Sequence, residues 1–226
     1  MTSRPSISRQ PTREERRARD PLGDFLVWWD DVTREDADEL ERVLDQACCN
    51  PRAAERERAL QRHLEEHPLL LIQHMGGGHG RWVIPQKKLG AEFVPDFVIG
   101  ESYSGGGSWT LVELESPASL MFRKDGDPSA SLQHALRQLT DWRAWLMRNR
   151  DYAARSRNDN GLGLTDISPN SRGLVLIGRE RDLDPADNPR RQRLEEDNMI
   201  MLHSYDWLVR QARGRAEAME RARRER

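Results

Sequence analysis

Trp109–Pro117 reads WTLVELESP, and the alternation of apolar and polar residues within it is typical of a β-strand. The side chains of Val112 and Leu114 point to one face of such a strand. Those of Glu113 and Glu115 point to the other face, about 6–7 Å apart. Two carboxylates so placed repel each other and resist removal from water. Their face must therefore meet solvent, which would hydrate both acids, or a positively charged group that lies between them.

A second strand is predicted just upstream. Residues 92–101, EFVPDFVIGE, are separated from WTLVELESP by SYSGGGS, residues 102–108, which has the composition of a hairpin loop. The two strands should pair antiparallel, and this pairing brings Asp96 close to Glu113. An earlier β-rich run, RWVIPQKKLG at residues 81–90, completes a three-strand meander.

Helical patterns precede the meander. Thr33 and Asp36 form a capping signal ahead of an apolar helix face that runs to Ala47. A second helix is predicted for residues 52–67, and Pro68 should end it because proline cannot continue a helix.

A longer helix is predicted after the meander. Asp127 suits its N-cap, Pro128 suits its first position, and the apolar period continues to about Asn149. RGLVLIGRE at residues 172–180 is a further strand. An arginine-rich connection then leads to MIMLHSYDWLVRQA at residues 199–212, a strand that runs into a closing helix. This order of helices and strands indicates a mixed α/β fold.

The chain has 226 residues, 33% of them charged, and a net charge of -2, which gives no general reason to expect a nucleic-acid partner. Residues 1–22 are rich in arginine without an apolar period and are predicted to be disordered. An N-terminal helical segment follows at 23–50, the main domain at 51–210, and an arginine-rich helix end or tail at 211–226. The two arginine-rich ends either contact phosphate or only keep the chain in solution.

Several classes of protein are disfavoured. Cys48 and Cys49, the two cysteines, are adjacent, which suits neither a relaxed disulfide nor a zinc site. The glycine-rich HMGGGHG at residues 74–80 lacks the ending of a phosphate-binding P-loop. No apolar run is long enough to span a bilayer, and the N-terminus lacks the apolar core of a signal peptide. We therefore expect a soluble, cytoplasmic protein without membrane contact.

Asp96, Glu113 and Glu115 are candidates for a metal site. Three acids that converge at one edge of a sheet offer the hard oxygen ligands that Mg²⁺ or Mn²⁺ prefers. A cation there would remove the repulsion between the carboxylates, and it can polarise a phosphate and lower the pKa of a water. The alternative is a solvent-exposed strand face on which the acids are only hydrated.

The segments VPDFVIG (94–100) and LVELESP (111–117), joined by a hairpin, resemble the core of PD-(D/E)xK nucleases. A longer series of segments, in order over about residues 53–210, resembles the DUF4263 family, the nuclease domain of the Shedu anti-phage proteins. These segments are ERALQRHLEEHPLLL (57–71), VIPQKKLGAEFVPDFVIG (83–100), VELESP (112–117), QHALRQLTDW (133–142), GLVLIG (173–178) and HSYDWL (203–208).

The resemblance implies an α/β, restriction-endonuclease-like core in which helices flank a mixed sheet. It also implies a Mg²⁺-dependent DNA endonuclease that acts in defence against phage and assembles as a homo-oligomer. Asp96 and Glu113 correspond to the metal-binding acids. Glu115 stands where the family pattern has lysine, so it binds metal, acts on the attacking water or marks an inactive site. In the last case the chain is a nucleic-acid-binding, regulatory or oligomeric protein that retains the nuclease fold.

Five more residues are interpreted in the light of the resemblance. Glu57 corresponds to the acid that many such nucleases contribute from their first helix; otherwise it is a solvated partner of a neighbouring arginine. Gln138 and Trp142, one turn apart, resemble a Gln-x-x-x-Tyr feature that positions substrate, although Trp142 also suits the core. Lys87 and Lys88, on the preceding strand, could supply the positive charge of the family's lysine, or be solvated.

Overall fold

The computed structural model describes residues 11–76 and 80–225, in which six helices and five strands follow one another. They are α1 (Arg13–Arg19), α2 (Arg34–Cys49), α3 (Ala53–Glu66), β1 (Gly80–Pro85), β2 (Phe97–Tyr103), β3 (Gly106–Leu114), α4 (Ala130–Ala154), β4 (Arg172–Leu176), α5 (Asn188–Asn198), β5 (Ile200–His203) and α6 (Tyr205–Arg224).

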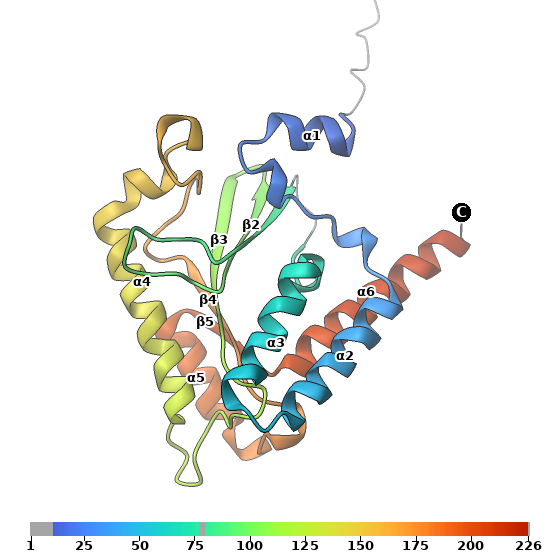
Figure 1. The fold of residues 1–226 in the computed structure, drawn as a ribbon, viewed down its shortest axis with the longest axis vertical. Coiled ribbons are helices and arrows are strands. Elements are labelled where there is room, and N and C mark those ends of the chain that lie inside the picture. The colour runs from blue at the N-terminus through green and yellow to red at the C-terminus, as the bar shows by residue number, and fades with distance from the viewer. Residues whose placement is uncertain (1–10, 77–79, 226) are drawn as a thin grey trace, which may run out of the picture.

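The five strands form one mixed sheet in the order β1-β2-β3-β4-β5. β1, β2 and β3 pair antiparallel as the predicted meander, whereas β3, β4 and β5 pair parallel. Parallel neighbours need a crossover, which α4 provides between β3 and β4 and α5 between β4 and β5. Helices lie on both sides of the sheet (Figure 1). The predicted mixed α/β fold, a sheet flanked by helices, is confirmed.

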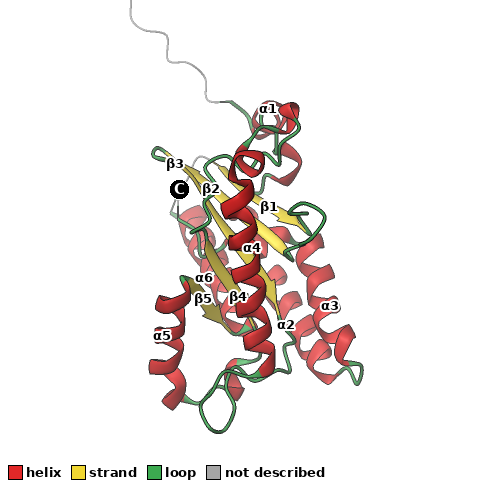
Figure 2. Ribbon diagram, turned by 90° about the vertical axis from the view of Figure 1, so that its left-hand side faces the viewer, coloured by secondary structure: helices red, strands yellow, loops and turns green. Residues whose placement is uncertain are grey.

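The alternation of side chains along β3 divides the core into two. Val112 and Leu114 face the side that α2, α3 and α6 cover, and Leu111 faces the side that α4 covers. In Figure 1, α2 and α6 lie side by side on the first side, and Figure 2 shows α4 lying across the strands on the second. Glu113 and Glu115 share the face of Leu111 because strand side chains alternate, so both acids belong to the α4 side.

The capping residues decide where two helices begin. At α2 the Thr33 hydroxyl accepts a hydrogen bond from the Asp36 amide, and the Asp36 carboxylate accepts one from the Thr33 amide, as predicted. At α4 the N-cap is Ser129, so the prediction of Asp127 is wrong. Asp127 instead belongs to the loop before the helix, where its carboxylate pairs with Arg123 at 2.6 Å and its main-chain oxygen accepts a hydrogen bond of 2.8 Å from the Arg123 amide.

Two helices lie where no helix is predicted. α1 falls within residues 1–22, which are expected to be disordered, because Thr12 and Glu15 form a capping box that begins it. Residues 1–10 of that predicted tail lie outside the described residues. α5 occupies the arginine-rich connection, and Leu194 is its one residue packed against the core, so it shows no apolar period.

One helix is longer than predicted, and the C-terminal segment predicted as a helix end or tail is helical to Arg224. α4 continues past Asn149, where its backbone departs from helical geometry, to Ala154. α6 continues through the predicted helix end or tail, and Arg213 pairs there with Asp38 and Glu41 of α2. Arg213 in the arginine-rich C-terminal segment therefore joins α6 to α2 through ion pairs.

Candidate metal centre

The pairing of β2 with β3 brings the predicted acids to one end of the sheet. Phe97 lies opposite Val112 in this antiparallel pair, so Asp96, just before β2, lies beside the end of β3. The Asp96 carboxylate accepts a hydrogen bond of 2.8 Å from the amide of Leu114. The predicted antiparallel pairing is confirmed, and it sets Asp96 beside the strand that carries Glu113.

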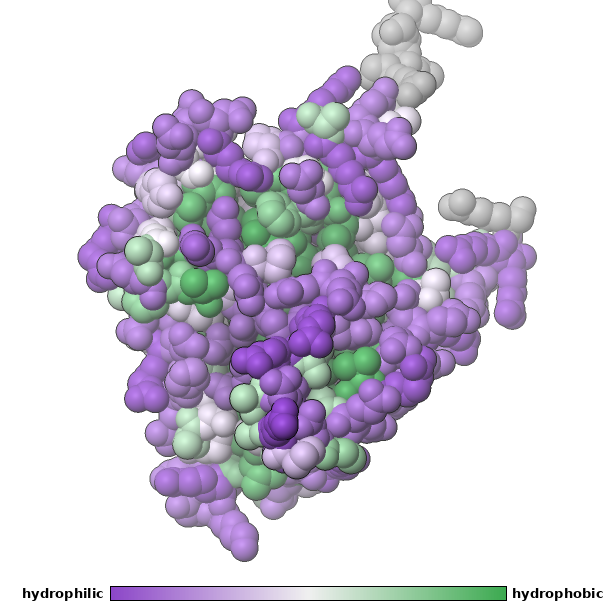
Figure 3. All heavy atoms as spheres, in the orientation of Figure 1, coloured by the Kyte–Doolittle hydropathy of each residue, from purple (hydrophilic) through white to green (hydrophobic). Residues whose placement is uncertain are grey.

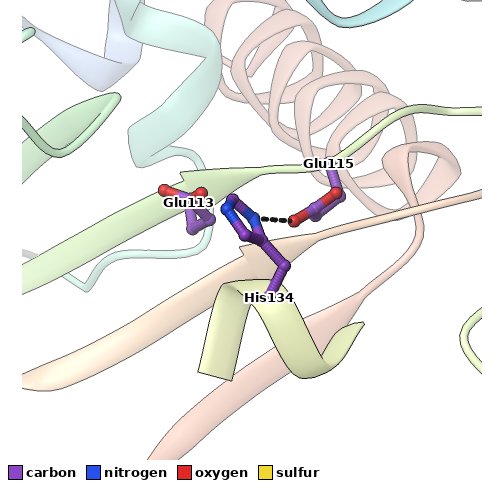
Figure 4. Close-up of side chains that lie close together, drawn as sticks. All are labelled: Glu113, Glu115 and His134. Carbon is purple, nitrogen blue, oxygen red and sulfur yellow. Dashed lines mark hydrogen bonds and ion pairs between the residues drawn. The ribbon is translucent and has the colours of Figure 1, made fainter. Parts of the chain in front are cut away.

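Glu113, within β3, and Glu115, just after the strand ends, are both buried, with exposed fractions of 4% and 7%. The interpretation that solvent hydrates them on an open strand face is therefore wrong. The side-chain amide of Gln138 donates a hydrogen bond of 2.6 Å to Glu113. Nδ1 of His134 lies 2.9 Å from a carboxylate oxygen of Glu115. Figure 4 shows His134 reaching from α4 to Glu115, with Glu113 beside both.

Glu113, Glu115 and His134 form a compact cluster, in which one ligand atom from each lies within 4.8 Å of the others. The His134 side chain is 54% exposed, so the cluster opens to solvent at the imidazole. Asp96 is not part of this cluster, although its charge raises the pKa of Glu113. The structure thus groups His134, rather than Asp96, with the two glutamates.

Burial raises the pKa of each acid at this end of the sheet. Desolvation, followed by the charge of Asp96, raises the pKa of Glu113 to about 9. Desolvation also raises the pKa of Asp96 to about 6 and that of Glu57 to about 7. It raises the pKa of Glu115 as well, and the hydrogen bond with His134 opposes that rise. Within the described residues no lysine or arginine forms an ion pair with any of these acids.

α3 brings two polar side chains to the same region. The charges of Asp96 and Glu115 contribute to the raised pKa of Glu57, which is half-buried. One turn further along, the amide of Gln61 donates to the main-chain oxygen of Asp96 at 3.4 Å and to Glu65 at 2.7 Å. Glu57 is therefore within electrostatic reach of the cluster, while its assignment as a catalytic acid stays a prediction.

The structure keeps the predicted lysines apart from the acids. β1 ends at Pro85, so Lys87 and Lys88 lie in the loop after the strand and not on the strand as expected. The Lys87 ammonium donates to the carbonyl of Leu162 at 3.0 Å, and Lys88 is exposed. Trp142 is fully buried in the core under α4, so the core interpretation of this residue is confirmed.

Two contacts of the site are not singled out by the sequence pattern. His134 lies one helical turn before Gln138, and this i,i+4 spacing could have revealed it, because such residues share a helix face. The Tyr205 hydroxyl donates a hydrogen bond of 2.8 Å to the main-chain oxygen of Glu115. No local signal could have revealed that contact, because α6 follows much later in the chain.

The donor set of this site fits a divalent cation. Carboxylate oxygens suit Mg²⁺ and Mn²⁺, and the imidazole of His134 adds a ligand that transition ions accept more readily. In the part of the chain that the structure describes, Glu113 and Glu115 are buried without a lysine or arginine partner. A metal ion would supply the compensating charge.

The sequence profile of a family described as "Shedu protein SduA, C-terminal" matches residues 54–209. The chain belongs to this family. The match to the Shedu domain runs from the start of α3 into α6 and includes every acid of the candidate metal centre. The resemblance found in the sequence is thus confirmed, while α1 and α2 lie outside the matched range.

Among solved structures, the restriction endonuclease FokI bound to DNA resembles this Shedu domain with a TM-score of 0.42 and 13% sequence identity. The alignment covers 95% of this chain and 32% of that chain, so this chain spans about a third of that protein's length. No curated protein matches the sequence. No helix among residues 11–76 and 80–225 has both the length and the apolar character that crossing a membrane requires.

Proposed function

We propose that this Shedu domain is a metal-dependent DNA endonuclease of the PD-(D/E)xK type that acts in defence against phage. The observation that carries the proposal is the burial of Glu113 and Glu115 next to Asp96, without a lysine or arginine paired to them in the described ranges. Buried carboxylates cost free energy unless a cation balances them. Membership of the Shedu family supports the role in defence.

Glu113, Glu115 and His134, whose ligand atoms cluster, would hold the ion, and Asp96, whose charge acts on Glu113, would be a further ligand. When bound, Mg²⁺ or Mn²⁺ neutralises these carboxylates and polarises a phosphodiester so that water can attack its phosphorus. DNA would approach from the solvent side of the cluster, where His134 is exposed. The homo-oligomer that the family resemblance implies stays a prediction.

The protein's own residues would orient the reacting groups. Gln138 fixes the carboxylate of Glu113, and Tyr205 fixes the main chain at Glu115. Glu115, oriented by its contact with His134, would accept the proton of the attacking water. Glu57, with a pKa raised by burial to about 7, exchanges its proton near neutral pH, which suits a general acid or base.

Cleavage of supercoiled and linear DNA in the presence of Mn²⁺ tests this function. We expect Asp96→Asn and Glu113→Gln each to lose at least about 10²-fold in rate, because both remove charge from the metal centre. Glu92→Gln is the matched control, since Glu92 is an exposed acid in the loop that precedes β2. A wild-type rate no higher than that of Asp96→Asn would overturn the proposal, and the domain would then be an inactive relative that only binds nucleic acid.

A further inference from the structure

A cavity of about 650 Å³ lies beneath α1, far from the acids. Its aromatic walls are Trp28, Trp29 and Trp82, and Arg81 of β1 also lines it. Arg81 lies opposite Glu101 in the pairing of β1 with β2, and Glu101 is the fifth residue after Asp96. Five residues of strand span roughly 16 Å, so this cavity is separate from the candidate metal centre.

Ion pairs and cation–π contacts of its arginines hold α1 over this cavity. Arg13 forms ion pairs with Asp30 and Asp31, each at 2.7 Å. The guanidinium groups of Arg13 and Arg17 lie 5.0 and 4.8 Å from the centre of the Trp28 ring, which is the range of a cation–π contact. Figure 1 shows α1 at one end of the molecule, and apolar residues gather below it in Figure 3. These contacts make α1 the roof of the cavity.

Arg81 is the feature of the cavity that indicates a ligand. It is only 3% exposed, and its Nε and Nη2 atoms have no hydrogen-bond partner among the residues that the structure describes. The charges of Glu101, its neighbour across the strand pair, and of Asp30 act on Arg81 from a distance, but neither forms an ion pair with it among the described residues. The guanidinium lies 5.7 Å from the Trp29 ring. A buried cation without an anionic partner costs free energy, and an anion in the cavity would reduce that cost.

The aspartates of the lining are already engaged. Asp20 accepts a hydrogen bond of 3.2 Å from the indole of Trp82 and another of 2.7 Å from the amide of Leu22. Asp30 is paired with Arg13. Three arginines and two aspartates line the cavity, so its formal charge is 3 − 2 = +1: Arg16, Arg19, Arg81, Asp20 and Asp30. The lining therefore favours an anion with an aromatic part.

We propose that this cavity binds a nucleoside phosphate, with the base against the tryptophan rings and the phosphate on the side of Arg81. Tryptophan rings stack on the flat face of any base, and a guanidinium pairs strongly with phosphate oxygens. A free nucleotide and a single nucleotide within a single strand of DNA present the same group. The site is additional to the proposed nuclease centre and does not depend on it.

Calorimetric titration of the full chain in EDTA, in which no metal-dependent cleavage occurs, tests the site directly. Deoxyadenosine 5′-monophosphate should bind at least about tenfold more tightly than deoxyadenosine or inorganic phosphate alone, because each of these lacks one half of the recognised group. A short oligodeoxyadenylate forms the second arm. Tighter binding of the oligonucleotide that Arg81→Gln weakens assigns the site to a nucleotide within a strand, and tighter binding of the monophosphate assigns it to the free nucleotide.

Two variants test the residues, with circular dichroism to verify that each one folds. Arg81→Gln should weaken binding of the monophosphate about tenfold or more, and Trp28→Ala about fivefold or more. Arg172→Gln is the matched control, because Arg172 is an exposed strand arginine outside this cavity, and it should bind as the wild type does. The proposal is overturned if Arg81→Gln binds like the wild type, if deoxyadenosine binds as tightly as its monophosphate, or if no probe binds. Trp28→Ala decides if Arg81→Gln does not fold.

Discussion

Glu115 is held at its side chain and at its main chain. Its carboxylate lies 2.9 Å from His134, its amide donates to the carbonyl of Leu176 at 2.9 Å, and its own carbonyl accepts from Tyr205 at 2.8 Å. The family pattern has lysine at this position, so the surroundings of the glutamate matter. The Glu115 carboxylate has a hydrogen-bond partner on α4, His134, and this contact supports a catalytic or metal-binding role for the glutamate.

We expect Glu115→Lys to lower the rate of DNA cleavage, even though it restores the residue of the family pattern. The lysine ammonium would stand beside His134 in a site suited to a metal ion and would repel that ion. Glu115→Ala should lower the rate by about 10²–10⁴-fold, the usual effect of losing a positioned proton acceptor. Single-turnover cleavage of plasmid DNA at saturating Mn²⁺ measures both variants. A Glu115→Lys variant that cleaves faster than the wild type would show that the glutamate site is a relic.

The strand period and the hairpin composition were enough to predict that Asp96 lies beside the end of the strand that leads to Glu113 and Glu115. Their alternation and the glycine-rich loop are local features, and local features fix the pairing of neighbouring strands. The burial of the glutamates and the contact with His134 depend instead on how α4 is rotated and placed over the sheet. That placement follows from the packing of the whole helix, so no short pattern predicts it.

Among the helices and strands, Arg179, which follows β4, links the end of that strand to α2 and α6. Its guanidinium pairs with Asp206 in the first turn of α6 at 2.9 Å and with Asp45 of α2 at 2.6 Å. The Arg179 side chain is 6% exposed, so both ion pairs are partly shielded from water. Removing this one residue breaks the contacts among the sheet, α2 and α6 together.

Arg179→Met should therefore lower the free energy of unfolding by about 2 kcal/mol, less than the 3–5 kcal/mol typical of fully buried pairs because Asp45 stays largely solvated. Urea denaturation monitored by circular dichroism measures the change. Arg210→Met on α6 is the matched control, because the pair of Arg210 with Glu180 is exposed at both ends and should contribute little. Equal losses in the two variants would mean that Arg179 does not link these elements.

Elements with a strong apolar period were predictable, and the others were not. α2, α3 and α4 each bury a regular stripe of residues, which a sequence pattern reveals. Neither α1 nor α5 contains a buried residue, so their helical state depends on capping and on contacts with other elements. The start of α4 was misplaced because Asp127 and Ser129 are both good capping residues, and the pairing of residues 121–123 with residues 127–129 that keeps Asp127 out of the helix is not visible in the sequence pattern.

At the scale of the whole molecule, two sets of groups give stability opposite dependences on pH. Burial lowers the pKa of His74 and His203 from 6.5 to about 4, so the folded protein gains stability as pH rises towards 6.5 and these histidines lose their protons. Burial raises the pKa of Glu113 from 4.5 to about 9, so the folded state holds a proton that the unfolded state has lost. Stability then falls as pH rises between these values, and above pH 6.5 these two histidines no longer oppose that fall.

In EDTA the free energy of unfolding of the wild type should therefore fall between pH 7 and pH 9, because the buried Glu113 must give up its proton without a cation nearby. Mn²⁺ binds the deprotonated, folded cluster, so it should raise stability more at pH 9 than at pH 7. Glu113→Gln cannot ionise: in EDTA it should be more stable than the wild type at pH 9, and it should respond less to Mn²⁺. Urea denaturation at both pH values measures these differences, with the exposed Glu92→Gln as the control that behaves like the wild type. If Glu113→Gln loses stability with rising pH as steeply as the wild type does, the carboxyl of Glu113 is not a buried ionisable group. If the two differ in EDTA as expected but Mn²⁺ changes the stability of neither, the metal site alone is refuted.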